Sequence, residues 1–275
     1  MRQYHPDDGG TAVTFTAEHA WRITAPQAGD CLLFFDFDGT LAPVGDDPTT
    51  VRPVPQAVDA LTTLAGLVQR VAIVSARPVE FLHQRFPAVA DIDLYGLYGL
   101  EHRCGAEEPV TDPAALPWVP TMAELADQAR AELPSDALVE YKRLSVALHY
   151  RTAPQLAGVI EAWGRAQAEL RGLRVQVGRM VIELKPPVNR DKGMVVGEAI
   201  RSAGCAWYFG DDVSDLKAFG ALRARAETDS DFFGVCVAVA NPESGFEVSQ
   251  AADLTVPSPE ALGEFLTETV RRLRR

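Results

Sequence analysis

The sequence predicts an α/β protein whose doubly wound, mostly parallel sheet carries a smaller inserted α+β layer. Short continuous apolar runs alternate with segments of helical spacing, as is typical of parallel strands buried on both faces. This alternation stops near residue 106 and returns after Pro186-Pro187. Between these points the order becomes helix, two strands, helix, two strands, which favours a small antiparallel sheet.

Composition narrows the function classes. The 275 residues suffice for one large domain, or for two of which one is inserted, and 47% hydrophobic residues exclude a wholly disordered chain. A net charge of −12 disfavours binding to nucleic acid. No apolar stretch reaches the roughly 18 residues of a membrane helix, and the polar N-terminus is not a secretory signal. Four dispersed cysteines without C-x-x-C pairing favour a reducing, cytoplasmic location.

The first part of the core follows from three apolar runs. We expect residues 1–28 to form a flexible arm with one short helix around Glu18–Trp21, because they show no sustained periodicity. The expected strands are Cys31–Phe35, Val71–Val74 and Leu94–Leu97, and the expected helices are Pro55–Val68 and Pro78–Phe86. Right-handed crossovers would join these strands into one sheet.

The inserted layer and the second part of the core follow in the same way. A proline-rich link leads into the layer, whose expected helices are Met122–Leu133 and Ala153–Arg171 and whose expected strands are Ala137–Tyr141, Leu144–Tyr150, Leu173–Val177 and Met180–Leu184. The core then resumes with expected helices Gly193–Ala203, Ser214–Leu222 and Pro259–Arg272 and strands Ala206–Phe209, Val235–Val239 and Asp253–Val256. We therefore assign residues 29–106 and 187–275 to the core and 107–186 to the insertion.

Polar residues follow the core strands at the points where they end. In open α/β sheets, ligands bind outside the carboxyl ends of the strands. The residues that leave those ends, or begin the helix after the insertion, are Asp36, Asp38, Ser75, Arg77, Lys192, Asp211, Asp212 and Asp215. We expect them to meet at one edge of the sheet.

Paired carboxylates at that edge point to a metal. Asp36 and Asp38 are two residues apart, so on a strand end they point to the same side. Two carboxylates at so short a distance repel each other unless a cation lies between them. A site made only of oxygen ligands suits Mg²⁺. Because Mg²⁺ readily shares phosphate oxygens, carboxylates with a serine and Lys192 indicate phosphoryl chemistry.

Each of these patterns also has a structural explanation. A lone D-x-D is most often a turn or cap, the G-D-D-x-x-D of residues 210–215 could be a helix N-cap, Ser75 could cap a helix and Lys192 could be a surface lysine. Their joint order, each at a strand end or helix start of one sheet edge, favours a functional site.

The same residues carry a family resemblance. DFDGTL (36–41), Ser75, Lys192 and GDD (210–212) resemble the four motifs of the haloacid dehalogenase superfamily of phosphatases. Over about residues 30–270 the chain is similar to the trehalose-6-phosphate phosphatases, and KRLSVALHYRTAP (142–154) and VIELKPPVNRDKG (181–193) carry this closer similarity. The resemblance implies a haloacid dehalogenase-like core, with residues 107–186 as an inserted α+β cap domain.

The resemblance also implies a reaction, the hydrolysis of trehalose 6-phosphate to trehalose and phosphate through an aspartyl-phosphate. It implies Asp36 as nucleophile and Asp38 as general acid and base, with Ser75 and Lys192 on the transferring phosphoryl group. Mg²⁺ would be held by Asp36, the Asp38 backbone carbonyl and Asp211, while Asp212 and Asp215 would orient metal waters and Lys192.

Sugar contacts are implied mainly in the cap domain. The implied residues are Arg77, Glu101, Lys142, His149, Arg151 and Glu183, and a functional link to a trehalose-phosphate synthase is implied as well. Edge-strand charges would be the alternative role for Lys142, His149 and Arg151, and a bridge between two loops the alternative for Arg77. The family commonly has a small polar residue or His where Tyr98 stands, Gly where Ala76 stands and Glu where Leu216 stands.

Three other functions remain open from the sequence. The motifs shared across the superfamily fit phosphatases of other sugar phosphates, such as sucrose phosphate or mannosyl phosphoglycerate. A phosphomutase would show phosphoryl transfer without net phosphate release. A silent binding module usually lacks the nucleophile or a metal ligand, whereas Asp36, Asp38, Lys192 and Asp211 are all present here.

Overall fold

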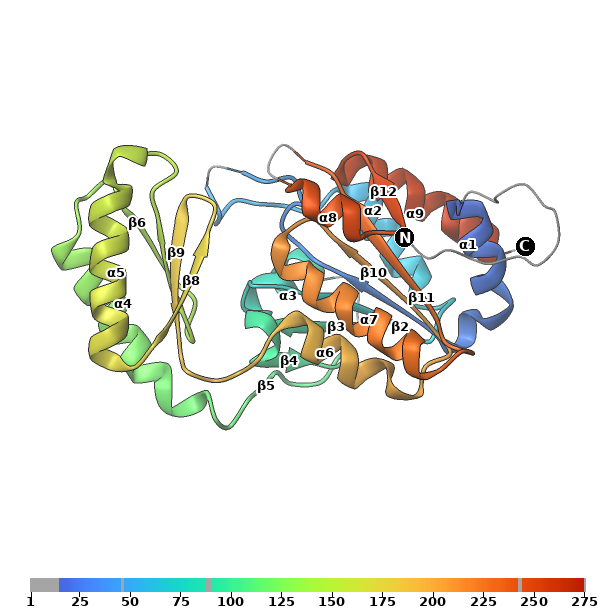
Figure 1. The fold of residues 1–275 in the computed structure, drawn as a ribbon, viewed down its shortest axis with the longest axis horizontal. Coiled ribbons are helices and arrows are strands. Elements are labelled where there is room, and N and C mark those ends of the chain that lie inside the picture. Colours follow the sequence, from blue (N-terminus) through green and yellow to red (C-terminus); the bar gives the residue numbers. More distant parts are fainter. Residues whose placement is uncertain (1–14, 46, 88–90, 242–243, 275) are drawn as a thin grey trace.

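The structure, a computed structural model, describes residues 15–45, 47–87, 91–241 and 244–274. Its strands form two sheets, an eight-stranded one with the order β12-β11-β10-β1-β2-β3-β4-β5 and a four-stranded one with the order β6-β7-β9-β8. Figure 1 shows the smaller sheet and its two helices as a separate layer beside the larger sheet. The expected α/β fold with an inserted α+β layer is confirmed.

Six parallel strands make up most of the large sheet. They are β1 (Cys31–Phe35), β2 (Arg70–Val74), β3 (Ile92–Gly96), β10 (Cys205–Gly210), β11 (Phe233–Val239) and β12 (Leu254–Val256). Strand β1 lies between β2 and β10, so the strand order reverses beside it. Such a reversal point is where ligands bind in open α/β sheets.

Two further strands extend the large sheet in the antiparallel direction. Strand β4 (Glu101–Arg103) pairs with β3, and β5 (Val110–Thr111) pairs with β4. The sequence analysis did not predict these strands, because they are short and lack an apolar run. Since β5 still belongs to the large sheet, the chain leaves that sheet a few residues after the expected boundary at residue 106.

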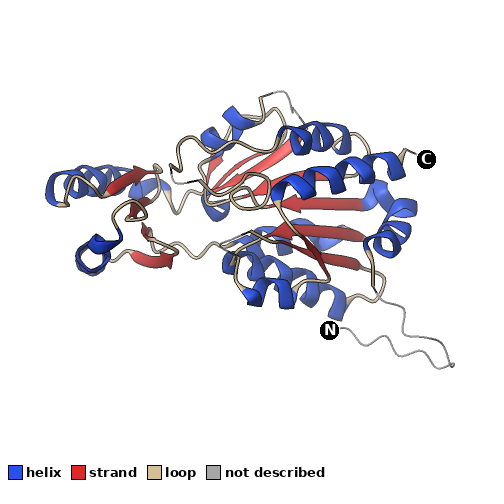
Figure 2. Ribbon diagram, turned by 90° about the horizontal axis from the view of Figure 1, so that it is seen from above, coloured by secondary structure: helices blue, strands red, loops and turns tan. Residues whose placement is uncertain are grey.

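Helices cover both faces of the large sheet (Figure 2). Alternate residues of β1 point to opposite sides, and Leu33 and Phe34 belong to different hydrophobic clusters. The Leu33 side packs against α1 (Ala17–Thr24), α2 (Pro55–Leu64), α3 (Val79–Arg85) and α9 (Pro259–Leu273), and the Phe34 side against α6 (Lys192–Ala199), α7 (Leu216–Thr228) and α8 (Phe246–Ala251). Short 3₁₀ turns are η1 (Ala25–Asp30), η2 (Leu97–Gly99), η3 (Leu116–Trp118), η4 (Pro154–Leu156), η5 (Ile200–Ser202) and η6 (Val213–Asp215). None of the helices in the described ranges has the length and apolar character of a membrane-spanning segment.

Helix α1 confirms the short helix expected around Glu18–Trp21, but it is packed on the core and is not part of a flexible arm. Thr16 caps it, with the Oγ1 atom accepting the His19 N–H at 3.2 Å, and one side of the helix is buried against the core. There Trp21 stacks on Trp207 of β10, with 4.0 Å between the ring centroids. Residues 17–24 are thus part of the packed core, whereas residues 1–14 of the expected arm lie outside the described residues.

The cap domain has two chemically different sheet faces. Its elements are α4 (Val119–Glu132), β6 (Leu138–Tyr141), β7 (Val146–His149), α5 (Ala157–Arg171), β8 (Arg174–Gly178) and β9 (Val181–Lys185). Leu148 and Ile182 pack with the helices on one face. Register pairing aligns Glu140, Ala147, Glu183 and Gln176 in one row across the other face. Because the helices cover the apolar face, this polar row faces the core (Figure 1).

Candidate active site

Asp36 stands at the end of β1, at the point where the strand order reverses. Its backbone N–H donates to the Phe209 carbonyl at 2.9 Å, which joins the ends of β1 and β10. The chain then turns sharply, and the Gly39 N–H donates to the Ala42 carbonyl at 2.7 Å. Gly39 has a φ of +80°, a backbone conformation that glycine adopts without a Cβ penalty. This turn directs the Asp36 and Asp38 side chains to the sheet edge predicted from the sequence.

Lys192 lies between two carboxylates at this edge. Its Nζ is 2.8 Å from Asp36 Oδ1 and 2.7 Å from Asp215 Oδ1, and the side chain is almost fully buried. Asp191 caps the start of α6 by accepting the Met194 N–H at 2.9 Å, which fixes where Lys192 leaves the helix. Burial alone would lower the pKa of Lys192, but Asp215 and Asp36 raise it well above its ordinary value. Lys192 is therefore a permanent positive charge beside Asp36.

Asp215 is fully engaged in hydrogen bonds. Its Oδ1 accepts from Lys192 and from the Tyr208 hydroxyl, each at 2.7 Å. Its Oδ2 accepts the backbone N–H groups of Asp211 and Asp212, each at 3.0 Å. With both oxygens occupied, Asp215 ties Lys192 to the loop after β10. Asp212 caps η6, where its Oδ1 accepts the Val213 N–H at 2.6 Å.

The Asp211 carboxylate is held from two sides. Thr40 Oγ1 donates to Asp211 Oδ1 at 3.0 Å, and Asn241 Nδ2 donates to Asp211 Oδ2 at 2.8 Å. Thr40 belongs to the turn after β1, and Asn241 follows β11 at the same edge of the sheet. Sequence reasoning missed Asn241, although its position just beyond an apolar strand was a usable signal.

Three buried carboxylates form a cluster at the centre of the site. Asp36, Asp211 and Asp215 each present an oxygen atom, and these atoms lie within 4.8 Å of one another. Burial and the neighbouring carboxylates, opposed by Lys192, raise the pKa of Asp36 well above its ordinary value. Burial and Asp215 likewise raise the pKa of Asp211 to about 7. Burying several carboxylate charges this close together costs free energy. A hard divalent cation would fit this cluster because it would favour the ionised carboxylates.

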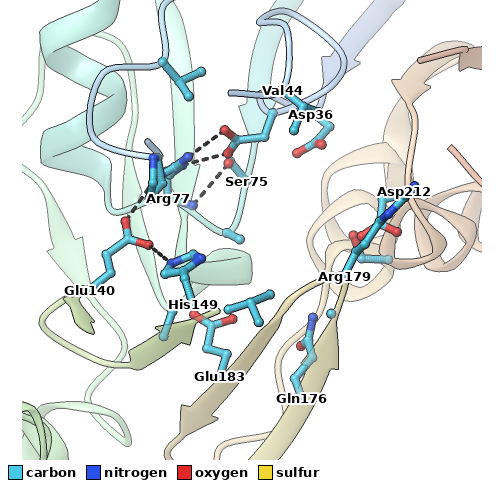
Figure 3. Close-up of a pocket in the computed structure, with 18 of the residues that line it drawn as sticks. Asp36, Val44, Ser75, Arg77, Glu140, His149, Gln176, Arg179, Glu183 and Asp212 are labelled. Atoms are coloured by element: carbon cyan, nitrogen blue, oxygen red, sulfur yellow. Dashed lines mark hydrogen bonds and ion pairs between the residues drawn. The ribbon is translucent and has the colours of Figure 1, made fainter. Parts of the chain in front are cut away.

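Ser75 and Arg77 follow β2 and lie beside Asp38. Ser75 Oγ accepts the Arg77 N–H at 3.1 Å, which fixes the loop. Arg77 Nε and Nη2 each donate to an oxygen of Asp38 at 2.7 Å, and Nη1 donates to Glu140 of the cap domain at 3.0 Å (Figure 3). Arg77 thus bridges two loops of the core, as its structural alternative suggested, and also reaches the cap domain.

Glu183 is a buried carboxylate on the polar face of the cap domain. Its Oε1 accepts from the Ser145 hydroxyl at 2.7 Å and from Lys142 Nζ at 3.3 Å. Burial opposes ionisation, yet Lys142 keeps the pKa of Glu183 below its ordinary value. The Tyr98 hydroxyl donates to Glu183 Oε2 at a long 3.5 Å. Glu183 is therefore an ionised acceptor with capacity for a further hydrogen bond.

Glu140 lies beside basic side chains of both the core and the cap domain. Besides Arg77, His149 Nε2 lies 2.9 Å from Glu140 Oε2 and Lys142 Nζ lies at 3.7 Å. Burial opposes ionisation, but Lys142, His149 and Arg77 lower the pKa of Glu140 to about 2. Sequence reasoning missed Glu140, although it shares a strand face with Lys142 two residues on.

Tyr98 and Gln176 were also missed. Tyr98 belongs to the core and has a φ of +60°, which is unusual for a non-glycine residue. Its hydroxyl accepts from Gln176 Nε2 of β8 at 2.9 Å, and the Lys185 ammonium lies 3.6 Å from its ring centroid. The signal in the sequence was Tyr98 itself, where the resembled family commonly has a smaller side chain.

A cavity of about 240 Å³ lies between the core and the polar face of the cap domain. Figure 3 shows residues that line it from both parts. Its lining includes Asp36, Asp38, Ser75, Arg77, Lys142, His149, Arg151, Glu183, Lys192, Asp211 and Asp212. Glu101 is not part of this lining. Its carboxylate accepts the Val79 N–H at 3.1 Å and pairs with Arg143 at 2.7 Å, which braces the link into the cap domain.

Known proteins are similar to this chain over most of its length. A family model described as "Trehalose-phosphatase" matches residues 34–252. The curated "Trehalose-phosphate phosphatase" of Mycolicibacterium paratuberculosis is 36% identical over 255 residues, which cover 88% of this chain and 63% of the relative. The chain thus spans less than two thirds of the length of that relative.

Solved structures share the fold. The "C. albicans Trehalose-6-phosphate phosphatase C-terminal domain" has a TM-score of 0.76 at 20% sequence identity, covering 94% of this chain and 97% of that one. A "haloacid dehalogenase-like hydrolase" from Bacteroides thetaiotaomicron has a TM-score of 0.58 at 15% identity, covering 86% and 98%. The haloacid dehalogenase-like fold predicted from the motifs is confirmed.

Proposed function

The chain belongs to the trehalose-phosphatase family, and we propose that it is a Mg²⁺-dependent phosphatase that hydrolyses trehalose 6-phosphate to trehalose and phosphate. One observation carries the proposal: Lys192 joins Asp36 to Asp215 inside a cluster of buried carboxylates that opens into the cavity below the cap domain. Trehalose biosynthesis, a cytoplasmic location and a functional link to a trehalose-phosphate synthase are parts of the same proposal.

The acidic cluster is the proposed metal site. Asp36, Asp211 and the backbone carbonyl of Asp38 would hold Mg²⁺, a donor set of oxygens only. When bound, the ion would offset the carboxylate charges and the negative charge of the phosphate. Thr40 and Asn241 hold the Asp211 carboxylate in place for this role.

Asp36 is the proposed nucleophile. Its carboxylate oxygen bonds to phosphorus as the bond from phosphorus to the sugar oxygen breaks, which leaves an aspartyl-phosphate. Lys192, 2.8 Å away, stabilises the ionised Asp36 and then the charge that grows on the phosphoryl oxygens. The Ser75 hydroxyl accepts one backbone N–H and can still donate its own proton to a phosphoryl oxygen.

Asp38 is the proposed general acid and base. It gives a proton to the departing sugar oxygen and then takes one from the water that attacks the aspartyl-phosphate. That water adds to phosphorus and breaks the bond to Asp36, so the enzyme is regenerated and phosphate is released.

The polar face of the cap domain is the proposed sugar site. Lys142, His149, Arg151 and Glu183 all line the cavity, and Glu183 is a buried, ionised acceptor for a sugar hydroxyl. Arg77 lines the cavity too, with its guanidinium bound to Asp38 and Glu140. Glu101 braces the link to the cap domain, so we propose a positioning role for it in place of a sugar contact.

Phosphate release from a panel of sugar phosphates, with and without Mg²⁺, tests the proposal. We expect trehalose 6-phosphate to be turned over fastest and EDTA to stop the reaction. Faster turnover of sucrose phosphate or mannosyl phosphoglycerate would reassign the substrate, and transfer without net phosphate release would indicate a phosphomutase. Asp36→Asn should fold normally and lose turnover, and activity near that of the wild type would refute the nucleophile assignment.

A further inference from the structure

Arg77 joins the proposed acid and base of the core to the cap domain. Its guanidinium contacts Asp38 through two hydrogen bonds of 2.7 Å and Glu140 of β6 through one of 3.0 Å. The Arg77 side chain is 7% exposed, whereas the Asp38 side chain is 34% exposed. A buried, planar donor therefore sets the orientation of a more accessible carboxylate.

Three contacts besides Asp38 restrain Arg77, one at its backbone and two at its guanidinium. The central guanidinium carbon lies 4.6 Å from the centroid of the Phe81 ring, and the Arg77 backbone N–H donates to Ser75 Oγ. The third restraint is Glu140, which His149 and Lys142 hold inside the cap domain. Since Phe81 and Ser75 belong to the core, only the contact with Glu140 depends on the position of the cap domain.

We propose that Arg77 is a positioning residue that couples the cap domain to catalysis, because Glu140 orients its guanidinium and the guanidinium orients the Asp38 carboxyl group. This inference rests on the proposed phosphatase function. Each Asp38 oxygen accepts one hydrogen bond from Arg77 and keeps a further lone pair, so it can still exchange a proton with substrate. The two bonds fix the plane of the carboxyl group and so aim it at the leaving oxygen.

Arg77→Lys is the decisive variant, because lysine keeps the positive charge but cannot bind two carboxylate oxygens in a fixed fork. The test compares two aryl phosphates of similar size whose leaving groups differ in their need for a proton. Phenolate needs a proton from Asp38 to leave, whereas p-nitrophenolate leaves without one. We expect kcat/KM to fall about 10- to 100-fold for phenyl phosphate, part of the roughly 100- to 10,000-fold that general acid catalysis contributes, and less than about 3-fold for p-nitrophenyl phosphate.

The same variant is also measured on the sugar phosphate that the wild type turns over fastest. A positioning role lowers kcat there, because both the departure of the sugar and the attack of water use Asp38. A direct sugar contact would instead raise KM and leave kcat unchanged. That result, or an equal loss on both aryl phosphates, would overturn the inference.

Glu140→Ala tests the link to the cap domain. We expect kcat/KM of Glu140→Ala to fall more for phenyl phosphate than for p-nitrophenyl phosphate. The double variant with Arg77→Lys should lose no more kcat/KM than Arg77→Lys alone. Independent, multiplying losses would show that Glu140 does not act through Arg77, and an unchanged Glu140→Ala enzyme would refute the coupling.

Arg85→Lys is the matched control. Arg85 stacks on the same Phe81 ring at 3.8 Å, but its guanidinium donates to the Thr49 carbonyl at 2.7 Å and not to Asp38. Arg85→Lys should keep the wild-type ratio of kcat/KM for the two aryl phosphates. Thermal melting of all variants reports whether they fold. A shifted dependence in Arg85→Lys would overturn the assignment to Arg77. Failure of the proposed function itself would appear separately, as unchanged activity in Asp36→Asn.

Discussion

The carboxylate of Asp211 lies directly against the backbone of Gly39. A Cβ atom placed on Gly39 would be 2.1 Å from Asp211 Oδ2, well inside van der Waals contact. Thr40 and Asn241 bind the two oxygens of the same carboxylate, so Asp211 is enclosed by its neighbours. A side chain at position 39 must therefore displace a proposed metal ligand.

Gly39→Ala should inactivate the enzyme without unfolding it. The Cβ atom pushes Asp211 away from Asp36, and the positive φ of residue 39 adds strain of about 1–2 kcal/mol. Since a displacement of about 1 Å near the chemistry can cost roughly 100-fold, we expect a loss of at least that size in kcat/KM. Phosphate release would measure the activity, a Mg²⁺ titration the metal affinity, and circular dichroism the fold.

Gly172→Ala is the control for backbone strain. Gly172 ends α5 with a φ of +66°, and no atom lies within 4 Å of a Cβ placed on it. This variant should lose about 1 kcal/mol of stability and keep full activity. A comparable loss of activity in both variants would contradict the role given to the contact between Gly39 and Asp211.

Mg²⁺ binding should depend on pH near neutrality. Burial and Asp215 raise the pKa of Asp211 to about 7, so protons compete with the metal for this carboxylate. Metal affinity should rise by up to about tenfold per pH unit below 7 and level off above it. The increase in melting temperature caused by Mg²⁺, measured from pH 5.5 to 8.5, reports this dependence. An increase that does not vary with pH would contradict it.

The metal-free protein should show the opposite trend in stability. The unfolded chain releases the Asp211 proton near an ordinary pKa of about 3.9, whereas the folded chain keeps it until about 7. The folded state then binds more protons between these values, so this group makes unfolding easier as pH rises through that window. Asp211→Asn should flatten this part of the pH profile of the unfolding free energy.

The edge of the sheet that carries the proposed active site could be predicted because it follows from strand periodicity. Asp36 and Asp211 each end a continuous apolar strand, and Lys192 begins the helix after the insertion, so sheet topology brings them together. Glu140 and Gln176 could not be found this way. Their roles depend on how the polar face of one sheet meets the edge of another, which no local pattern encodes. Strands β4 and β5 were missed because both are short and neither contains an apolar run.

The packing of α1 was also beyond the sequence pattern, and it gives a stability prediction. Trp21 stacks on Trp207, whose indole N–H donates to Thr24 Oγ1 at 2.9 Å, so the eight-residue helix is held by tertiary contacts. Trp21→Ala should lower the free energy of unfolding by about 3–5 kcal/mol, a typical cost for removing a buried aromatic side chain. Urea denaturation would measure it.

Phe15→Ala serves as the control in the same segment. Phe15 is 36% exposed and contacts His19 edge-on, so its removal should cost less than about 1 kcal/mol. If Trp21→Ala were as mild as Phe15→Ala, helix α1 would not be an integral part of the core.

Glu183→Gln should separate sugar recognition from phosphoryl chemistry. The amide keeps the shape of the side chain and an acceptor for Ser145, but it loses the charge that pairs with Lys142. A hydrogen bond from a sugar hydroxyl to an ionised group contributes about 1.5–3 kcal/mol, so kcat/KM for trehalose 6-phosphate should fall about 10- to 100-fold. Because p-nitrophenyl phosphate offers no sugar hydroxyl, its hydrolysis should change less than about 3-fold. Glu132→Gln, on the helix side of the cap domain, should leave both substrates unaffected. Equal losses on the two substrates in Glu183→Gln would place Glu183 outside sugar recognition.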